Sequence, residues 1–176
     1  MSGGFRPQVI IGIKNGGAQV ARQMLASLPP EALYCEVCVT RPSTRQKEHS
    51  FAHQLLRHLP LWMCDALRIM ESRMAAWRSS RSKTVRIGKV ELSKDVSVCL
   101  QSGRCRVLIV DDAIDTGATM QKVRDQLLSS YPDLDIRIAA ITVTIPHPLC
   151  EADYSLYHNR TLCRFPWSND YRSCKN

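Results

Sequence analysis

Residues 106–120 read RVLIVDDAIDTGATM, and this stretch decides the fold. Residues 107–110 are a continuous run of β-branched residues and leucine, typical of a strand buried on both faces of a parallel sheet. Because side chains alternate along a strand, Asp111 and Asp112 at its carboxyl end point in different directions at the sheet's rim. Open α/β sheets bind ligands at that rim. The stretch therefore predicts an α/β protein whose function lies beside this acidic pair.

The turn after the acids has the features of an anion site. It carries hydroxyl groups at Thr116 and Thr119, and Gly117 can adopt backbone angles that other residues avoid. A helix is predicted from about residue 118 to residue 129, and its first amide groups lack partners within the helix. A bound phosphate would satisfy these amides and the helix dipole together. The alternative is an ordinary strand-to-helix turn with an acidic cap.

This stretch resembles the signature of the type I phosphoribosyltransferases, in which four apolar residues precede DDxxxTGxT; the whole pattern spans residues 107–119. The motif is most similar to the hypoxanthine/xanthine-guanine branch. The resemblance implies that Asp111 and Asp112 hold the ribose hydroxyls of phosphoribosyl pyrophosphate (PRPP), directly or through Mg²⁺, which is the implied cofactor. It also implies that the turn lines the 5-phosphate of PRPP, through Asp115, Thr116, Gly117, Ala118 and Thr119.

A second loop, GIKNGG at residues 12–17, follows a short apolar strand. A glycine pair before a helix lets backbone amides approach an anion closely, and Lys14 adds positive charge. In the family that this chain resembles, the equivalent loop binds the pyrophosphate of PRPP. The resemblance therefore implies pyrophosphate binding by Lys14, Asn15, Gly16 and Gly17, although the family commonly has Arg or Lys where this chain has Asn15.

The remaining pattern predicts a single domain over residues 1–176, a doubly wound, mostly parallel α/β sheet with helices on both faces. Further strands are expected at 8–13, 33–39, 135–145 and possibly 84–92, and a helix at 16–28. Residues 40–49 are basic, polar and interrupted by Pro42, and relatives close a loop at this place over PRPP. Its candidate ligands are Arg41, Ser43, Thr44, Arg45 and Lys47.

Residues 50–81 are a helical insertion that is unusual for the family. Methionines 63, 70 and 74 lie at helical spacing with Leu67 and Trp77, which gives an amphipathic helix. Its apolar stripe either packs on the core or docks a partner chain, so a homodimer or a complex through 50–81 is one expectation.

The implied reaction is attack of a purine-like nitrogen on C1 of PRPP, with pyrophosphate as the leaving group, as in purine salvage. In relatives that use 6-oxopurines, an acid just before Thr-Gly contacts the purine N7 proton, which makes Asp115 the candidate catalytic residue. Its alternative role is a helix cap. Phe165 and Trp167 are expected to stack on the base. Ile145 stands where the family has a Lys for the 6-oxo group, and Leu162 replaces a stacking Trp.

Charge and composition add a second class of hypothesis. The net charge is +8, and residues 41–94 carry 12 of the 24 Lys and Arg against 4 acids. Such a field attracts PRPP, RNA or an acidic partner, so the alternative to an enzyme is a PRPP- or nucleotide-sensing regulator that binds nucleic acid or a partner enzyme. The absence of a long apolar stretch predicts a cytoplasmic chain without membrane contact. The eight cysteines are expected to be buried thiols, with zinc binding at Cys35 and Cys38 as the alternative.

Overall fold

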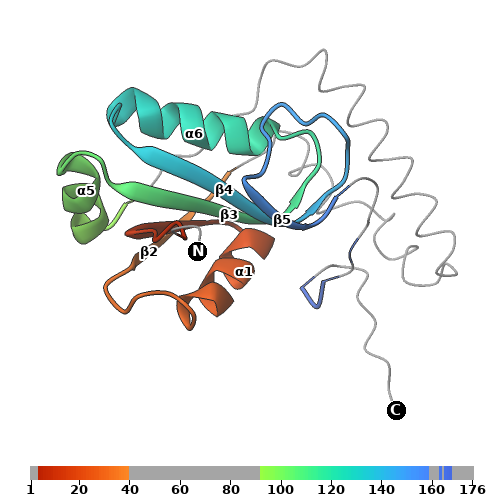
Figure 1. The fold of residues 1–176 in the computed structure, drawn as a ribbon, viewed down its shortest axis with the longest axis horizontal. Helices are drawn as coiled ribbons and strands as arrows, with labels where there is room; N and C mark the ends of the chain where they lie inside the picture. The colour runs from red at the N-terminus through yellow and green to blue at the C-terminus, as the bar shows by residue number, and fades with distance from the viewer. Residues whose placement is uncertain (1–3, 40–91, 159–162, 164, 168–176) are drawn as a thin grey trace, which may run out of the picture.

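The computed structural model describes residues 4–39, 92–158, 163 and 165–167, which build one five-stranded sheet (Figure 1). The strands lie in the order β2-β1-β3-β4-β5, and each neighbouring pair is parallel. Their bounds are β1 (Val9–Ile13), β2 (Leu33–Val37), β3 (Arg106–Ile114), β4 (Asp135–Val143) and β5 (Tyr154–Tyr157). The predicted parallel α/β sheet is confirmed.

Helices cover both faces of this sheet (Figure 1). Within the described residues they are α1 (Gly16–Leu25), α5 (Lys94–Gln101) and α6 (Ala118–Ser130). Leu100 of α5 and Val123 of α6 belong to one hydrophobic cluster, whereas Ala21 of α1 belongs to another. The helices on the two faces give the doubly wound arrangement that the sequence predicted.

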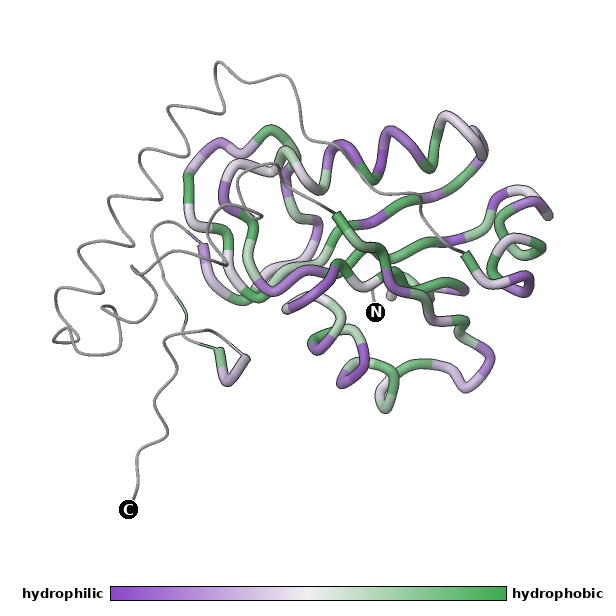
Figure 2. Tube along the Cα trace, turned by 180° about the vertical axis from the view of Figure 1, so that it is seen from behind, coloured by the Kyte–Doolittle hydropathy of each residue, from purple (hydrophilic) through white to green (hydrophobic). Residues whose placement is uncertain are grey.

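The central strand β3 separates the two clusters. Val107 and Ile109 belong to the cluster with α5 and α6, while Leu108 and Val110 belong to the cluster with α1. None of the four is more than 4% exposed. Figure 2, coloured by hydropathy, shows hydrophobic residues along the strands in the middle of the sheet. Burial on both faces, as the apolar run predicted, places the acids that follow it at a fixed point of the sheet.

Several element ends differ from the predicted ones. β3 continues through Asp111 and Asp112 to Ile114, because β4 is equally long and pairs with it as far as Val143. Helix α1 ends at Leu25 rather than near residue 28; the amide of Leu28 donates to Leu25 O in a tighter turn before Pro29. The acids therefore lie inside a paired strand rather than just beyond it.

Two elements were not predicted. Helix α5 buries only Val96 and Leu100, so its apolar pattern is too short to predict a helix. The clearest sign of its start is the N-cap Ser93, whose hydroxyl accepts a hydrogen bond from the amide of Val96. Strand β5 pairs with β4 at the sheet edge, and Leu156 on it is 75% exposed. Weak apolar patterning explains why both were missed.

Some predicted features lie outside the described residues, namely the basic loop at 40–49, the insertion at 50–81 and the possible strand at 84–92, except for Leu92, which lies in no strand. The described cysteines are free thiols, and Cys35, Cys105 and Cys150 are buried. Within the part of the chain that the structure describes, none of the helices has both the length and the apolarity that a bilayer crossing requires.

Candidate active site

The strand order places the candidate site at a reversal in the path of the chain. From β1 the chain passes through α1 to β2 on one side, and from β3 it passes through α6 to β4 on the other side. β1 and β3 are neighbours, with Gly12 paired to Val110. The loops that leave their carboxyl ends therefore diverge, and doubly wound sheets bind ligands in the crevice at such a point.

The glycine pair of the first loop packs directly against the acids of β3. A Cβ atom on Gly16 would lie 1.9 Å from Oδ2 of Asp112. A Cβ atom on Gly17 would lie 2.4 Å from the carbonyl oxygen of Val110 and 2.9 Å from Oδ1 of Asp111. A side chain at position 17 would collide with the backbone of β3, and one at position 16 would require the Asp112 carboxylate to move. The structure therefore brings together the two motifs that the sequence singled out.

The two acids differ in exposure. Asp111 is buried, at 9% exposure, while Asp112 is partly exposed. The amide of Asp112 donates to Oδ1 of Asp111 at 2.9 Å, which fixes the Asp111 carboxylate against its own strand. Asp112 is the more accessible of the pair.

The predicted anion turn begins helix α6 in the expected way. Gly117 is the N-cap residue and has a φ of +75°, a conformation that favours glycine. Thr116 Oγ1 accepts a hydrogen bond from the amide of Ala118 at 3.4 Å, and Thr119 is buried. The N-cap Gly117 has no side chain with which to cap α6, and the first turn of the helix contains no acidic residue. The start of α6 therefore presents a positive helix end without a competing carboxylate.

Gly117 also packs tightly against a neighbouring loop, which gives a stability prediction. A Cβ atom there would lie 2.6 Å from the backbone nitrogen of Cys150. Gly103 has a similar φ of +78° but nothing within 4 Å of an added Cβ atom. We expect Gly103→Ala to lower the free energy of unfolding by about 1–2 kcal/mol, because alanine is strained in a left-handed backbone conformation. Gly117→Ala should lower it further because its Cβ atom would also clash with Cys150. Urea denaturation of both variants measures the difference, and equal losses would contradict the close packing at Gly117.

Asp115 has a partner that the sequence did not suggest. The Thr144 hydroxyl, just beyond the end of β4, donates to Oδ1 of Asp115 at 2.9 Å. Thr144 is buried, and its amide donates to the carbonyl oxygen of Ile114 at 2.9 Å, so its position is fixed by the backbone. A threonine in a β-branched strand gives no sign of this contact, which depends on β3 and β4 being neighbours.

The aromatic residues near the C-terminus reach the acidic pair. Phe165 and Trp167 stack in parallel with ring centroids 5.2 Å apart. The Trp167 Nε1–H group donates to Oδ2 of Asp112 at 2.7 Å. The sequence predicted both rings beside the base, and it did not predict the hydrogen bond between residues 55 positions apart. The structure thus joins the aromatic pair to the acids of β3.

The first loop presents Lys14 and Asn15 next to the glycine pair. The Lys14 amide donates to the carbonyl oxygen of Val37 at 3.0 Å, and its Nζ lies 3.8 Å from Oε2 of Glu36. The Lys14–Asn15 peptide bond is cis, and Asn15 is the N-cap residue of α1 without a side-chain cap hydrogen bond. The candidate ligands of the basic loop, Arg41, Ser43, Thr44, Arg45 and Lys47, lie outside the described residues.

The carboxylate oxygens of the site suit a hard cation whose coordination shell is completed by a substrate. Among the described residues there is no group of at least three His, Cys, Asp or Glu side chains that could hold a metal. Mg²⁺ characteristically takes one or two protein carboxylates and completes its shell with water and substrate phosphate oxygens. Asp111 and Asp112 supply oxygen ligands of that kind, so the residues present fit a magnesium ion held jointly with a phosphorylated ligand.

Cys150, opposite Gly117, is not placed to act as a nucleophile. Burial raises the pKa of its thiol above the ordinary value, so the group stays protonated at neutral pH. The Cys150 thiol is therefore not a candidate nucleophile of the site.

Comparison with known proteins gives one family and several similar structures. The sequence model described as "Phosphoribosyl transferase domain" matches residues 1–151. A purine phosphoribosyltransferase from Pyrococcus horikoshii is similar in fold, with a TM-score of 0.57 and 19% identity over 98% of this chain and 83% of that one. A hypoxanthine phosphoribosyltransferase from Staphylococcus aureus has a TM-score of 0.52 and 17% identity over 87% of this chain and 62% of its own.

A xanthine-guanine-hypoxanthine phosphoribosyltransferase from Helicobacter pylori has a TM-score of 0.50 and 14% identity over 86% of this chain and 69% of its own. At these identities the three structures bear on the fold alone. A comparison with curated protein sequences finds no significant match.

Proposed function

Because the chain belongs to the phosphoribosyl transferase family, we propose that it transfers the 5-phosphoribosyl group of PRPP to a nitrogen of a purine-like base, with release of pyrophosphate. The observation that carries the proposal is the packing of Gly16 and Gly17 against Asp112 and Asp111. This packing brings the loop at 14–17 against the acidic pair, and the turn that follows the same strand leads into a second helix start. PRPP carries the three complementary groups: a pyrophosphate, a diol and a 5-phosphate.

Each part of PRPP has a matching partner in this arrangement. The start of α6, where the N-cap Gly117 has no side chain, and the hydroxyl of Thr116 suit the 5-phosphate, since the helix dipole favours an anion there. The loop with Lys14, Asn15 and the glycine pair suits the pyrophosphate. Asp112 Oδ2 accepts a hydrogen bond from the neutral N–H group of Trp167. A ribose hydroxyl is also a neutral donor and could make the same kind of hydrogen bond to this oxygen.

Magnesium belongs to the same proposal. Asp111 and Asp112 are the residues that would hold it, together with oxygens of the substrate. When bound, Mg²⁺ neutralises part of the negative charge on the departing pyrophosphate. The chain's own residues position the diol and the two phosphate ends, which limits the freedom of the sugar before reaction.

Asp115 is the group that we assign to proton transfer from the base. Its carboxylate follows β3 directly, and the Thr144 hydroxyl holds Oδ1 in place. A carboxylate so oriented can accept a hydrogen bond, and then a proton, from N7 of a purine ring. Thr144 is thus a positioning residue rather than a catalytic one.

The accepting base is proposed to be purine-like rather than a specific purine. Phe165 and Trp167 form a flat aromatic pair beside Asp112, which suits stacking on a heterocycle. Ile145 provides no cation for a 6-oxo group, and purine, hypoxanthine and xanthine-guanine enzymes are all named among the similar structures. The proposal includes a role in purine salvage in the cytoplasm. It also includes a homodimer, or a complex with a partner protein, formed through residues 50–81.

A panel of bases tests the proposal. The purified chain is incubated with PRPP and Mg²⁺ together with adenine, hypoxanthine, guanine, xanthine or orotate, and pyrophosphate release is measured. We expect release with at least one 6-oxopurine and none with orotate. Failure to consume any base would overturn the catalytic proposal. Binding of PRPP without turnover, with RNA affinity that falls as salt rises, would instead support the nucleotide-sensing regulator suggested by the basic segment.

A further inference from the structure

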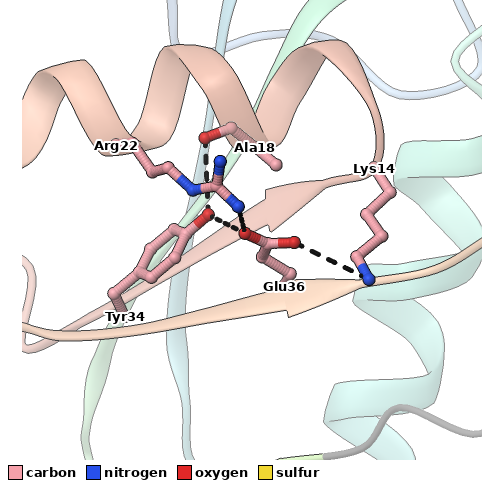
Figure 3. A network of polar contacts seen from close by, with 5 residues as sticks. All are labelled: Lys14, Ala18, Arg22, Tyr34 and Glu36. Atoms are coloured by element: carbon pink, nitrogen blue, oxygen red, sulfur yellow. Dashed lines mark hydrogen bonds and ion pairs between the residues drawn. The ribbon is translucent and has the colours of Figure 1, made fainter.

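Glu36 is the centre of a charged cluster beside the loop at 14–17. Figure 3 shows Lys14 from the loop, Arg22 from α1 and Tyr34 from β2 converging on this carboxylate. Glu36 lies on β2 opposite Gly12 of β1, so it flanks the strand that leads into the loop. Glu36 was not singled out from the sequence, because its partners are brought together only by the packing of α1 and β2.

The contacts to the two carboxylate oxygens are unequal. Oε1 accepts hydrogen bonds from the Tyr34 hydroxyl at 2.7 Å and from the Arg22 guanidinium. Oε2 lies 3.8 Å from the Lys14 ammonium, which is too long for a direct hydrogen bond. Of these three partners, Lys14 is the most weakly held.

Glu36 would still be paired with a cation and a hydrogen-bond donor if Lys14 left the cluster. The Tyr34 hydrogen bond and the neighbouring cations hold the pKa of Glu36 below its usual value, so the carboxylate is charged at neutral pH. Burial and the bond to Glu36 raise the pKa of Tyr34 to about 12, so its hydroxyl remains a donor. Arg22 and Tyr34 therefore continue to satisfy Glu36 in the absence of Lys14. The Lys14 side chain is 49% exposed, so it is free to turn toward a ligand.

We propose that Glu36 is the counter-ion of Lys14 in the absence of ligand, and that the Lys14 side chain leaves Glu36 when pyrophosphate binds the loop. Glu36 is then a positioning residue, because it competes with pyrophosphate for the Lys14 ammonium and so lowers the affinity of the loop for pyrophosphate. The inference rests on the proposed function and extends it to a residue outside the loop. Pyrophosphate carries several negative charges and Glu36 carries one, so the ammonium exchanges a long contact for a stronger one. After reaction, the return of Lys14 to Glu36 favours release of the product.

A double-mutant cycle on magnesium pyrophosphate binding tests the exchange. Dissociation constants are measured by calorimetry for the wild-type chain, Glu36→Gln, Lys14→Met and the double variant. Exposed ion pairs typically change an equilibrium constant by no more than about five-fold. We therefore expect Glu36→Gln to tighten binding about two- to five-fold, Lys14→Met to weaken it, and Glu36→Gln to have no effect once Lys14 is absent.

Tyr34→Phe is the matched control. It removes a hydrogen bond from the same carboxylate but leaves the Lys14 contact, so pyrophosphate affinity should stay within two-fold of wild type. The proposal fails if Glu36→Gln tightens binding equally in both backgrounds, if it does not tighten binding at all, or if Tyr34→Phe has the same effect. Thermal unfolding of each variant identifies a loss of fold.

The same measurements separate this inference from the function on which it rests. If the wild-type chain binds neither PRPP nor pyrophosphate, both the proposed function and the role of Glu36 are wrong. If it binds them and the cycle shows no coupling between Lys14 and Glu36, only the role of Glu36 is wrong.

Discussion

Replacing Asp111 and Asp112 together with asparagine is expected to weaken PRPP binding by about 10²- to 10⁴-fold. Hydrogen bonds to charged groups contribute roughly 1.5–3 kcal/mol each, and two such losses correspond to that range. Asparagine preserves the size of both side chains, so the contacts with Gly16 and Gly17 remain sterically possible. Calorimetric titration with PRPP in the presence of Mg²⁺ measures the effect.

The control for this variant replaces two exposed aspartates outside the site with asparagine. Asp95 and Asp133 are exposed, the first on α5 and the second in the turn before β4. Asp95→Asn combined with Asp133→Asn alters the net charge equally, and PRPP affinity should change less than about two-fold since exposed charges far from a ligand are screened. An Asp111/Asp112 variant that titrates like the wild-type chain would contradict the assignment of these acids to the diol.

The sequence was most informative where one short stretch determines its own structure. Four apolar residues followed by two acids sufficed to predict a central strand, and Gly117 predicted the left-handed turn before a helix that the structure contains. Such features depend on neighbours in the chain. Burial on both faces and a positive φ each leave a direct mark on residue type.

Features that depend on tertiary contacts could not be predicted from the sequence. Thr144 meets Asp115 only because β4 lies beside β3, and Trp167 meets Asp112 only because the chain folds back beside β3 at residues 165–167. Glu36 reads as an ordinary polar residue of an outer strand until α1 brings Arg22 to it. Pairwise contacts of this kind have no periodicity, so a single sequence contains no pattern from which to predict them.

Within the site, Asp115→Asn is expected to lower kcat about 10²- to 10⁴-fold, the usual range for loss of a general base, with little change in KM for PRPP. Asparagine can still accept the Thr144 hydrogen bond, so the turn should keep its shape, but it cannot take up a proton. Steady-state kinetics with the base identified from the panel measures both constants.

Thr144→Val provides the comparison that assigns the role of Asp115. Valine removes the hydroxyl that holds Oδ1 but leaves the carboxylate, so kcat should fall much less than in Asp115→Asn, by about ten-fold or less if one hydrogen bond worth roughly 0.5–1.5 kcal/mol is lost. The structure makes Gly117 the N-cap of α6, so the alternative helix-cap role of Asp115 is wrong. If Asp115 only accepts the Thr144 hydrogen bond, asparagine can replace it, and Asp115→Asn should leave kcat near the wild-type value. Urea denaturation alongside the kinetics measures the free energy of unfolding, so a fall in kcat without a fall in stability distinguishes a proton acceptor from a structural residue.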